Sequence, residues 1–495
     1  MQCWCGLGVV SKTLLLPQRG AGRISGANPQ PAYINFRDSD AERASLTAFD
    51  RLTARRDRWS FRVSAQDGEG VTISGLRTLS IAVVGLVLPL SAEADSAAIQ
   101  VRNSTEFAAA ISALRNTGGT IRLRRNHYAG EFVVGSRSAR PLHIIGERGV
   151  RLEGLFLEGT QYVSVSRLTI APMGQDAWLR ISGSRHIELH DLLVTAKRTR
   201  YRATVQVVES SHVVIQRSEF RHCGDRSPLF SNCLHLKHGT RHILIAHNWF
   251  HDCRGCDFIH GRFGYDLTLR GNRFERALPC RMNRDRCGHQ DLVSFWSGNR
   301  LLVERNTFGV YRLGAAQLYL IGGVDRVSIV NNVFRGTDPK VPGYRARVAI
   351  IVGSKGSKRV PHRVRIVNNT ILTGTRRIDG YAGSIRMSGV YWGLQPRKRP
   401  LLANNVIGLV EDPHHVCSVA HRAVSNVVLR GVACRGHNRV GRVHLDRYGR
   451  PTAASTLLID RASRGLSARR DLDGRPRDSR PDIGAFEYRG SKPRN

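Results

Sequence analysis

The chain has 495 residues, long enough for several ordinary domains or for one long repeat array. Lysine and arginine number 76 against 39 acidic residues, and this formal net charge of +37 predicts an anionic partner. An acidic polysaccharide fits that charge. Nucleic acid is not expected as a partner, because the sequence has no helix-turn-helix, zinc-finger or RNP-type motif.

The first 94 residues predict a leader in front of the folded part. Residues 1–70 are polar and arginine-rich without sustained periodicity, so they are expected to be disordered or a mis-annotated extension. Residues 71–94 contain a basic lead, an apolar run from Ile81 to Leu90 and an A-x-A ending at Ala94, which are the three parts of a secretory signal peptide. Translation is therefore expected to start near Val71. The run is too short to span a bilayer comfortably, so the sequence predicts a secreted, periplasmic or extracellular protein without a stable membrane span.

Residues 95–135 predict an N-terminal cap. Ser104-Thr105-Glu106 precede the apolar pattern F-A-A-A-I-S-A-L, which is typical of a capped amphipathic helix ending before Gly118-Gly119. Thr120 to Leu123 and Glu131 to Val134 then predict strands. A helix in this place would cover the open end of a stack of strands, which otherwise invites edge pairing.

A repeat of variable length occupies residues 136–440. Each unit is a short run rich in Val, Ile and Leu that closes on an apolar residue, and the closing residues are 23 to 37 residues apart. A solenoid with constant strands and variable loops produces such intervals. The closing residues are Ile170, Leu193, Phe220, Phe250, Phe274, Phe308, Phe334, Ile371 and Ile407. Two residues before the last six stand asparagines that predict a ladder of stacked side-chain amides, with Ser218 in that place before Phe220: Asn248, Asn272, Asn306, Asn332, Asn369 and Asn405.

These x-I-x-x-N-x-F units resemble the right-handed parallel β-helix proteins of the pectate-lyase type, over about Val101 to Tyr488. Within the C-terminal segment, residues 441–495, the stretch from Asp471 to Glu487 resembles a segment common in secreted members. The resemblance implies an all-β fold, a right-handed parallel β-helix solenoid with an N-terminal capping helix. It does not fix the function, because the family includes lyases, hydrolases, epimerases, esterases and non-catalytic adhesins.

Eight cysteines lie beyond the leader, an even number suited to an oxidising compartment. Counted from the closing residues, several fall at matching places on neighbouring turns, about 4.8 Å apart and within disulfide reach. The spacing predicts the pairs Cys223–Cys253, Cys233–Cys256, Cys280–Cys287 and Cys417–Cys434. A competing interpretation is zinc at Cys253-Arg254-Gly255-Cys256, but export and the absence of a second C-x-x-C favour disulfides, and no metal is expected there.

The densest collection of reactive side chains lies between Asn232 and Phe308. His235 and Lys237 are expected to point outward, because the leucines that alternate with them must face the core. Counting back from the closing residues also predicts an outward column of Asp257, Asp291 and Gln317. Tyr319 would face outward two positions further along.

The segment Asp257–Arg262 admits two registers. If Phe258 lies in the core, Asp257 faces outward beside Asp291, and a carboxylate pair roughly 5 Å apart suits glycoside hydrolysis. If the segment shifts by one residue, His260 and Arg262 stack on His235 and Lys237. The sequence alone does not choose between the two registers.

The cationic register suits β-elimination on a uronic-acid polymer. One cation neutralises the carboxylate and acidifies the C5 proton, and a second basic group, Lys or His, removes that proton. Several β-helix lyases use Lys and Arg in this way, so the resemblance supports Lys237 and Arg262 as the central pair, assisted by His235 and His260. The adjacent aspartates and G-H-G of the fold's usual hydrolases are absent, which demotes hydrolysis.

The remaining candidates would bind substrate. Trp296 and Tyr319 offer flat aromatic faces for sugar rings, and Arg284 lies in a basic loop that could wall a groove. Four aspartates between Asp471 and Asp482 suggest Ca²⁺, although the interleaved arginines favour internal ion pairs. The sequence thus predicts a lyase acting on an acidic polysaccharide, with a non-catalytic polysaccharide-binding β-helix as the alternative. The oligomeric state is left open.

Overall fold

The computed structural model divides the chain into two compact units, Met1–Leu90 and Ser91–Asn495. In the first unit, the described residues form one antiparallel hairpin of β1 (Ser60–Ser64) and β2 (Gly70–Ser74). The structure describes residues 60–64, 70–74, 98–171, 179–196, 203–223, 231–278, 291–309, 313–335, 345–353, 361–372, 384–387, 400–409, 422–430, 433–435 and 437–490. Most of the expected signal peptide thus lies outside the described residues. Within them, no helix combines the length and hydropathy that crossing a membrane requires.

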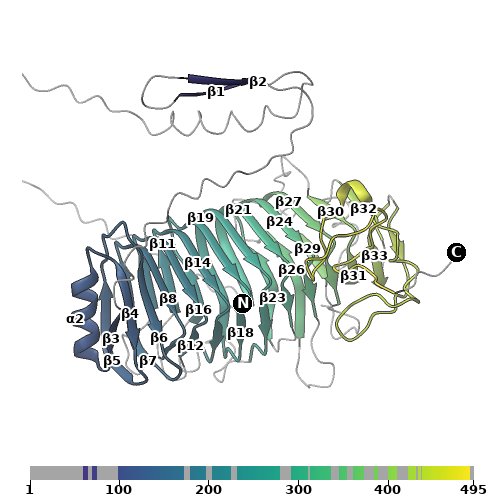
Figure 1. Cartoon of the computed structure of the whole chain (residues 1–495). Helices are drawn as coiled ribbons and strands as arrows, with labels where there is room; N and C mark the ends of the chain where they lie inside the picture. Colours follow the sequence, from purple (N-terminus) through teal and green to yellow (C-terminus); the bar gives the residue numbers. More distant parts are fainter. Residues whose placement is uncertain are drawn as a thin grey trace, which may run out of the picture. The chain divides into compact units, whose positions relative to one another are not determined.

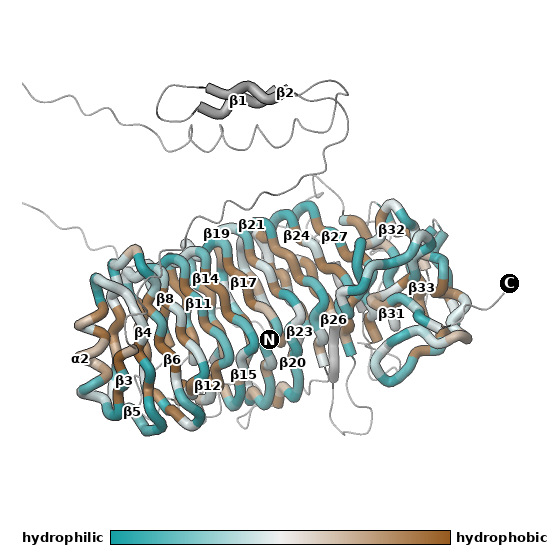
Figure 2. The backbone as a smooth tube through the Cα atoms, viewed as in Figure 1, coloured by the Kyte–Doolittle hydropathy of each residue, from teal (hydrophilic) through white to brown (hydrophobic). Residues whose placement is uncertain are grey.

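The second unit is a parallel β-helix whose strands stack into three sheets (Figure 1). Figure 2 shows hydrophobic residues interleaved with hydrophilic ones along the coil, as expected of strands with one buried face. The first sheet contains β5 (His127–Val134), β7 (Arg151–Glu158), β10 (Leu179–Ser182), β13 (Ala203–Val208), β16 (Ser231–Leu236), β19 (Cys256–Arg270), β21 (Val293–Glu304), β23 (Leu313–Leu320), β26 (Arg345–Val352) and β29 (Ser384–Met387).

The second sheet receives the later halves of β19 and β21 and runs the length of the coil. Its other strands are β3 (Ile99–Val101), β4 (Gly119–Leu123), β6 (Leu142–Gly146), β8 (Gln161–Ser166), β11 (Arg185–His190), β14 (Ser211–Gln216), β17 (Arg241–Ala246), β24 (Val324–Val330), β27 (His362–Val367), β30 (Leu401–Ala403) and β32 (Arg422–Val424).

The third sheet consists of short strands that close each turn. They are β9 (Thr169–Ile170), β12 (Leu193–Thr195), β15 (Glu219–Arg221), β18 (Trp249–His251), β20 (Arg273–Glu275), β22 (Thr307–Phe308), β25 (Val333–Phe334), β28 (Thr370–Ile371), β31 (Val406–Leu409), β33 (Val427–Arg430) and β34 (Arg439–Val440). The expected closing residues stack in register, except that Val194 rather than Leu193 aligns with Ile170 and Phe220. The phenylalanine rings from Phe220 to Phe334 stack at centroid distances of 4.5 to 5.1 Å.

The predicted asparagine ladder is present and longer than expected. Each Oδ1 accepts a hydrogen bond from the backbone N–H of the ladder residue one turn earlier, which is Ser218 for Asn248 and an asparagine thereafter, as between Asn306 and Asn272 at 2.8 Å. Each Nδ2 donates to the Oδ1 one turn later and to a backbone carbonyl. The ladder continues past Asn405 through Asn426 to Asn438. It satisfies polar backbone groups that the coil buries at this corner.

The predicted capping helix is α2 (Ser104–Leu114). Asn103 Oδ1 accepts the backbone N–H of Glu106, and the Glu106 carboxylate in turn accepts the backbone N–H of Arg102, an arrangement similar to a capping box. Phe107 is fully buried against Tyr128 and Phe132 of the first coil. The helix thereby covers apolar side chains at the N-terminal end of the stack.

The C-terminal segment folds back along the flank of the last turns. Residues in the left-handed region, immediately before the ladder positions, hold it: Asn331 donates to the carbonyl of Arg470, and Asn368 accepts from the backbone N–H of Ala468. Asn404 accepts from the backbone N–H of Ser463. The short 3₁₀ helix η3 (Arg464–Leu466) lies within this segment. The N-N dipeptides of the sequence therefore have two roles, since the first asparagine docks the C-terminal segment and the second extends the ladder.

The aspartates of this segment bind N–H groups. Asp471 accepts the backbone N–H of Arg475, Asp482 accepts those of Asp460 and Tyr488, and buried Arg477 pairs with Glu487. A Ca²⁺ site needs six to eight free oxygen ligands. This arrangement therefore does not fit the ion that the aspartates suggested.

Candidate functional site

The candidate site lies on β16, β19 and β21 in the first sheet. His235 pairs in register with His260, and His260 pairs with Ser294. The structure thus shows the shifted register, in which His-Gly-Arg of one turn overlies His-Leu-Lys of the turn before. The two imidazole centroids are 5.5 Å apart. Gly261 makes this register feasible, because its φ is +149° and a Cβ there would lie 1.9 Å from the carbonyl oxygen of Leu236.

Asp257 also joins the site, although the sequence placed it in the other register. Its Oδ2 lies 3.0 Å from Nδ1 of His260 and accepts the hydroxyl of Ser294 at 2.7 Å. Its Oδ1 accepts the backbone N–H of Asp291 at 2.7 Å. Because Asp257 is nearly fully buried while the His260 side chain is 24 % exposed, the carboxylate lies behind an imidazole that solvent reaches.

These contacts assign the proton of His260. The Ser294 hydroxyl donates to Asp257, so its oxygen accepts from Nδ1 of His260, 2.6 Å away. Nδ1 therefore carries the hydrogen, and Nε2 of the neutral ring is left as a proton acceptor. A carboxylate that holds an imidazole in one tautomer is the arrangement found where histidine acts as a general base.

His235, the other histidine of the site, is held in its uncharged form by its surroundings. Its pKa is lowered from 6.5 to about 4, chiefly by burial and to a smaller extent by the charges of Lys237 and of a protonated His260. His235 is therefore neutral at pH 7. A neutral imidazole can accept or donate a hydrogen bond without adding charge to the site.

This pKa shift gives a pH-dependent stability. A histidine whose folded pKa lies below its unfolded value stabilises the fold above pH 6.5, and this contribution disappears as the pH falls to about 4. We expect it to amount to about 2 kcal/mol, after a discount for partial exposure. His235→Gln should remove it, so the urea midpoints of the variant at pH 7 and pH 4.5 should differ less than those of the wild type. His143→Gln, at an exposed position, is the control. An equal difference between the urea midpoints at pH 7 and pH 4.5 in the two variants would contradict the prediction.

The cations of the site lie next to an aromatic ring. The Arg262 guanidinium carbon is 5.6 Å from the ring centroid of Trp296, and one Nη is 3.4 Å from Nε2 of His238. Trp296 is 43 % exposed and lies edge-on to His260 at 6.3 Å. Lys237 directly follows β16 and bonds the carbonyl of Val207 through its backbone N–H. The structure therefore brings Lys237, His235, His260, Arg262 and Trp296 to one place.

Gln317 does not join the expected outward column. It is fully buried, and its Nε2 donates to the carbonyls of Gly309 and Arg335. Val293 pairs with Leu318, so Asp291 aligns with Ala316 and not, as expected, with Gln317. Accordingly, the Asp291 carboxylate accepts the backbone N–H of Ala316. Asp291 is buried as well, whereas Tyr319 follows Ser294 in the histidine column. Arg284 lies outside the described residues.

Ser294 is the site residue that the sequence interpretation missed, because an outward Asp291 implies by strand alternation that Ser294, three positions later, faces the core. Val293 is buried and aligned with Ile259 and Leu318. Two consecutive buried apolar residues precede each position of the histidine column, Phe258-Ile259 before His260 and Leu292-Val293 before Ser294, which is itself covered. The chain must therefore bend between the two residues of each pair, and the alternation of inward and outward side chains is reset at that bend. Paired apolar residues were the signal that could have placed Ser294.

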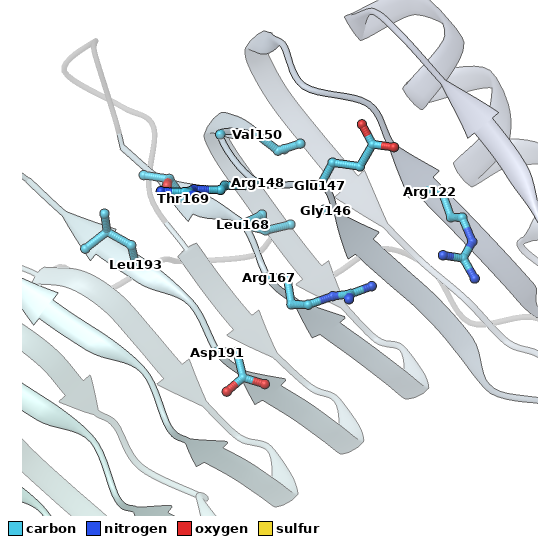
Figure 3. A pocket seen from close by; sticks show the side chains of 11 residues that line it. Arg122, Gly146, Glu147, Arg148, Val150, Arg167, Leu168, Thr169, Asp191 and Leu193 are labelled. Atoms are coloured by element: carbon cyan, nitrogen blue, oxygen red, sulfur yellow. The ribbon is translucent and has the colours of Figure 1, made fainter.

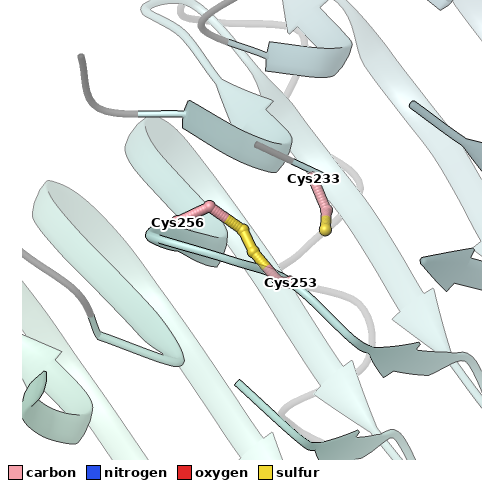
Figure 4. A group of neighbouring side chains, drawn as sticks. All are labelled: Cys233, Cys253 and Cys256. Carbon is pink, nitrogen blue, oxygen red and sulfur yellow. A yellow bond between two sulfur atoms is a disulfide. The ribbon is translucent and has the colours of Figure 1, made fainter. Parts of the chain in front are cut away.

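Four buried cysteines flank the site, and their pairing corrects two predictions. The disulfides are Cys223–Cys233 and Cys253–Cys256, not Cys223–Cys253 and Cys233–Cys256. The reason is the register: Asn232 pairs with Asp257, so Cys233 lies opposite Phe258, and Cys256 lies opposite Ser231. Each bond therefore closes a loop within its own turn. Figure 4 shows Cys233 beside the Cys253–Cys256 bond, and these three sulfurs lie within 4.8 Å of one another.

The other two predicted pairs fall partly or wholly outside the described residues. Cys280 and Cys287 are both outside them. Cys434 is disulfide-bonded, but Cys417 is not among the described residues.

Comparison with known proteins gives matches among solved structures alone. No protein-family model matches the sequence, and no curated protein does. Among solved structures, pectate lyase C from Erwinia chrysanthemi matches with a TM-score of 0.33 and 13 % identity, over 60 % of this chain and 81 % of that one. The catalytic domain of a GH87 alpha-1,3-glucanase matches with a TM-score of 0.30 and 12 % identity, over 61 % and 67 %.

A tailspike protein of Acinetobacter baumannii bacteriophage Fri1, a capsular polysaccharide depolymerase, matches with a TM-score of 0.28 and 10 % identity, over 73 % of this chain and 63 % of that one. Likenesses at this level carry no argument about activity. The predicted right-handed parallel β-helix with its capping helix is confirmed, and the chain is similar in fold to the pectate-lyase-like β-helix proteins.

Proposed function

We propose that the protein is a secreted, carbohydrate-active β-helix protein that cleaves an acidic polysaccharide by β-elimination. The observation that carries this proposal is the Asp257–His260 pair on an exposed face beside Arg262 and Lys237. Elimination next to a uronate needs a proton acceptor and a cation for the carboxylate, and the site supplies both. The fold's neighbours include a pectate lyase and a capsular polysaccharide depolymerase, but the proposal rests on the site.

Each residue has one role in this reaction. Arg262, oriented over the Trp296 ring, neutralises the uronate carboxylate and acidifies the proton on C5. Nε2 of His260 removes that proton while Asp257 stabilises the imidazolium that forms. The electron pair forms the C4=C5 double bond, the C4–O bond breaks, and water protonates the departing oxygen. Lys237 adds a second cation for the polymer, and neutral His235 contributes a hydrogen bond rather than a repelling charge.

Calcium has no assigned step in this scheme. The pectate lyase neighbour was determined with Ca²⁺. In the present site both oxygens of Asp257 already accept hydrogen bonds, Asp291 accepts the backbone N–H of Ala316, and two imidazoles, an ammonium and a guanidinium lie nearby. This set of donors does not fit a cation that takes six to eight oxygen ligands.

Absorbance of the unsaturated uronate tests the proposal. The purified protein, incubated with pectate, alginate or a glycosaminoglycan, should generate this chromophore, and Lys237→Ala should slow its formation by about 100-fold, the order that loss of one charge-stabilising group costs. The assay should run with added Ca²⁺ and with EDTA. Activity that survives Lys237→Ala would reject the assignment of this residue. Binding to all three polymers without the chromophore would favour the non-catalytic alternative.

A further inference from the structure

A depression of about 640 Å³ lies on a different part of the coil from the His260 site (Figure 3). It is formed where β4, β6, β8 and β11 end and the chain turns toward the third sheet. Its lining includes the side chains of Arg122, Arg148 and Arg167 from three successive turns. The His260 site, in contrast, lies on the first sheet near the middle of the coil.

The arginines of this depression lack acidic partners. None of the ion pairs among the described residues engages Arg122, Arg148 or Arg167. Two carboxylates also line the depression, but both are held by cations outside it: Arg124 binds Glu147, and Arg217 binds Asp191 at 3.0 Å. The bond from Arg217 keeps the pKa of Asp191 below its ordinary value, so this carboxylate stays with its partner.

Gly146 allows the turn that contains Arg167 and Leu168 to pack closely against the end of β6. A Cβ at this position would lie 2.6 Å from the carbonyl oxygen of Arg167 and 2.8 Å from the Cβ of Leu168. Any larger residue would therefore push the following turn away. The absence of a side chain at Gly146 thus lets the backbone at the end of β6 contact the backbone of Arg167 in the next turn.

We propose that this depression is a second binding site, for the acidic group and one or two rings of an anionic sugar. Its volume lies in the range of small-ligand sites. Guanidinium groups bind carboxylates and sulfates through paired N–H donors, and Val150, Leu168 and Leu193 provide apolar surface for a sugar ring. None of the described residues that line the depression is aromatic, so these residues offer no platform on which nucleic-acid bases would stack. The inference rests on the proposed function only for the choice of an acidic sugar, and it does not require catalysis.

Fluorescence anisotropy with labelled trigalacturonate tests this second site. The measurement should use the full chain carrying Lys237→Ala and Arg262→Ala, so that binding at the first site is removed. Adding Arg148→Ala with Arg167→Ala should weaken binding about tenfold. The matched control adds Arg185→Ala with Arg241→Ala, which removes the same charge from exposed positions on β11 and β17 and should weaken binding less than twofold.

Three results would overturn the inference. Equal weakening by the two double substitutions would show a response to net charge alone. Equal binding of labelled maltotriose would show that no anion is recognised, and tighter binding of a four-residue oligothymidylate would favour nucleic acid. The chromophore assay reports the first site separately, because Arg148→Ala with Arg167→Ala should leave cleavage of short substrates unchanged.

Discussion

Asn306→Leu should destabilise the protein by about 4 kcal/mol, because it replaces a side chain whose polar atoms are all hydrogen-bonded inside the coil with one that can neither donate nor accept a hydrogen bond. Oδ1 of Asn306 accepts from the backbone N–H and the Nδ2 of Asn272, and Nδ2 donates to Asn332 and to the carbonyl of Leu269. Leucine leaves the backbone N–H of Asn272 and the carbonyl of Leu269 without these partners in a region that excludes water.

Urea unfolding followed by fluorescence measures this loss. Hydrogen exchange should locate it, since a solenoid transmits instability mainly to the neighbouring turns, here those containing Asn272 and Asn332. Asn438→Leu is the matched control at the end of the ladder. Its side chain is only partly buried, so water replaces the lost bonds and the expected cost is about 1 kcal/mol. Equal costs at Asn306 and Asn438 would show that burial of the ladder does not matter.

Asp257→Asn should reduce kcat for elimination by about 1000-fold with little change in stability. The amide oxygen can still accept the backbone N–H of Asp291, so the local fold is kept. The amide nitrogen would then face Nδ1 of His260 as a donor, and the imidazole proton would move to Nε2. Nε2 could no longer accept the C5 proton, and replacing an orienting carboxylate by an amide costs up to about 10,000-fold in kcat where histidine is the general base.

Ser294→Ala separates this effect from simple loss of contacts. It removes one hydrogen bond to His260 but leaves the carboxylate of Asp257 in place, so the expected loss of kcat is about tenfold. The comparison is made from initial rates of chromophore formation, with denaturation midpoints measured in parallel. A kcat of Asp257→Asn within threefold of the wild type would remove His260 from the role of base.

Much of the fold could be predicted from the sequence, because its strongest signals are local. The Asn-x-Phe closings mark a short strand and a buried amide at a fixed spacing, whatever the length of the loop before them. The helix over Phe107 was predictable for the same reason, since its cap and its apolar pattern are contiguous. Neither prediction depended on how one turn aligns with the next.

The site depended on that alignment, and so the sequence alone did not determine it. The sequence offered two exclusive registers, one with Asp257 outward beside Asp291 and one with the histidines stacked. The structure combines parts of both: the histidines stack, and the chain turns after Phe258 so that the Asp257 carboxylate lies behind His260. The same corner turned Gln317 inward and placed Cys233 opposite Phe258 rather than opposite Cys256. A difference of one residue between turns reverses the side on which a residue lies, and counting from the closing residues cannot detect it.

The docked C-terminal segment has a consequence for the order of folding. Its bonds to the coil join residues very distant in sequence: Ala468 to Asn368 across 100 positions, and Leu472 to Arg305 across 167. Contacts of such high sequence separation form late, because the intervening chain must first be ordered. The turns from Arg305 to Asn404 must therefore be stacked before the segment can attach. Attachment of the C-terminal segment thus marks completion of the coil, and a chain that ends early lacks the contacts that hold its final turns.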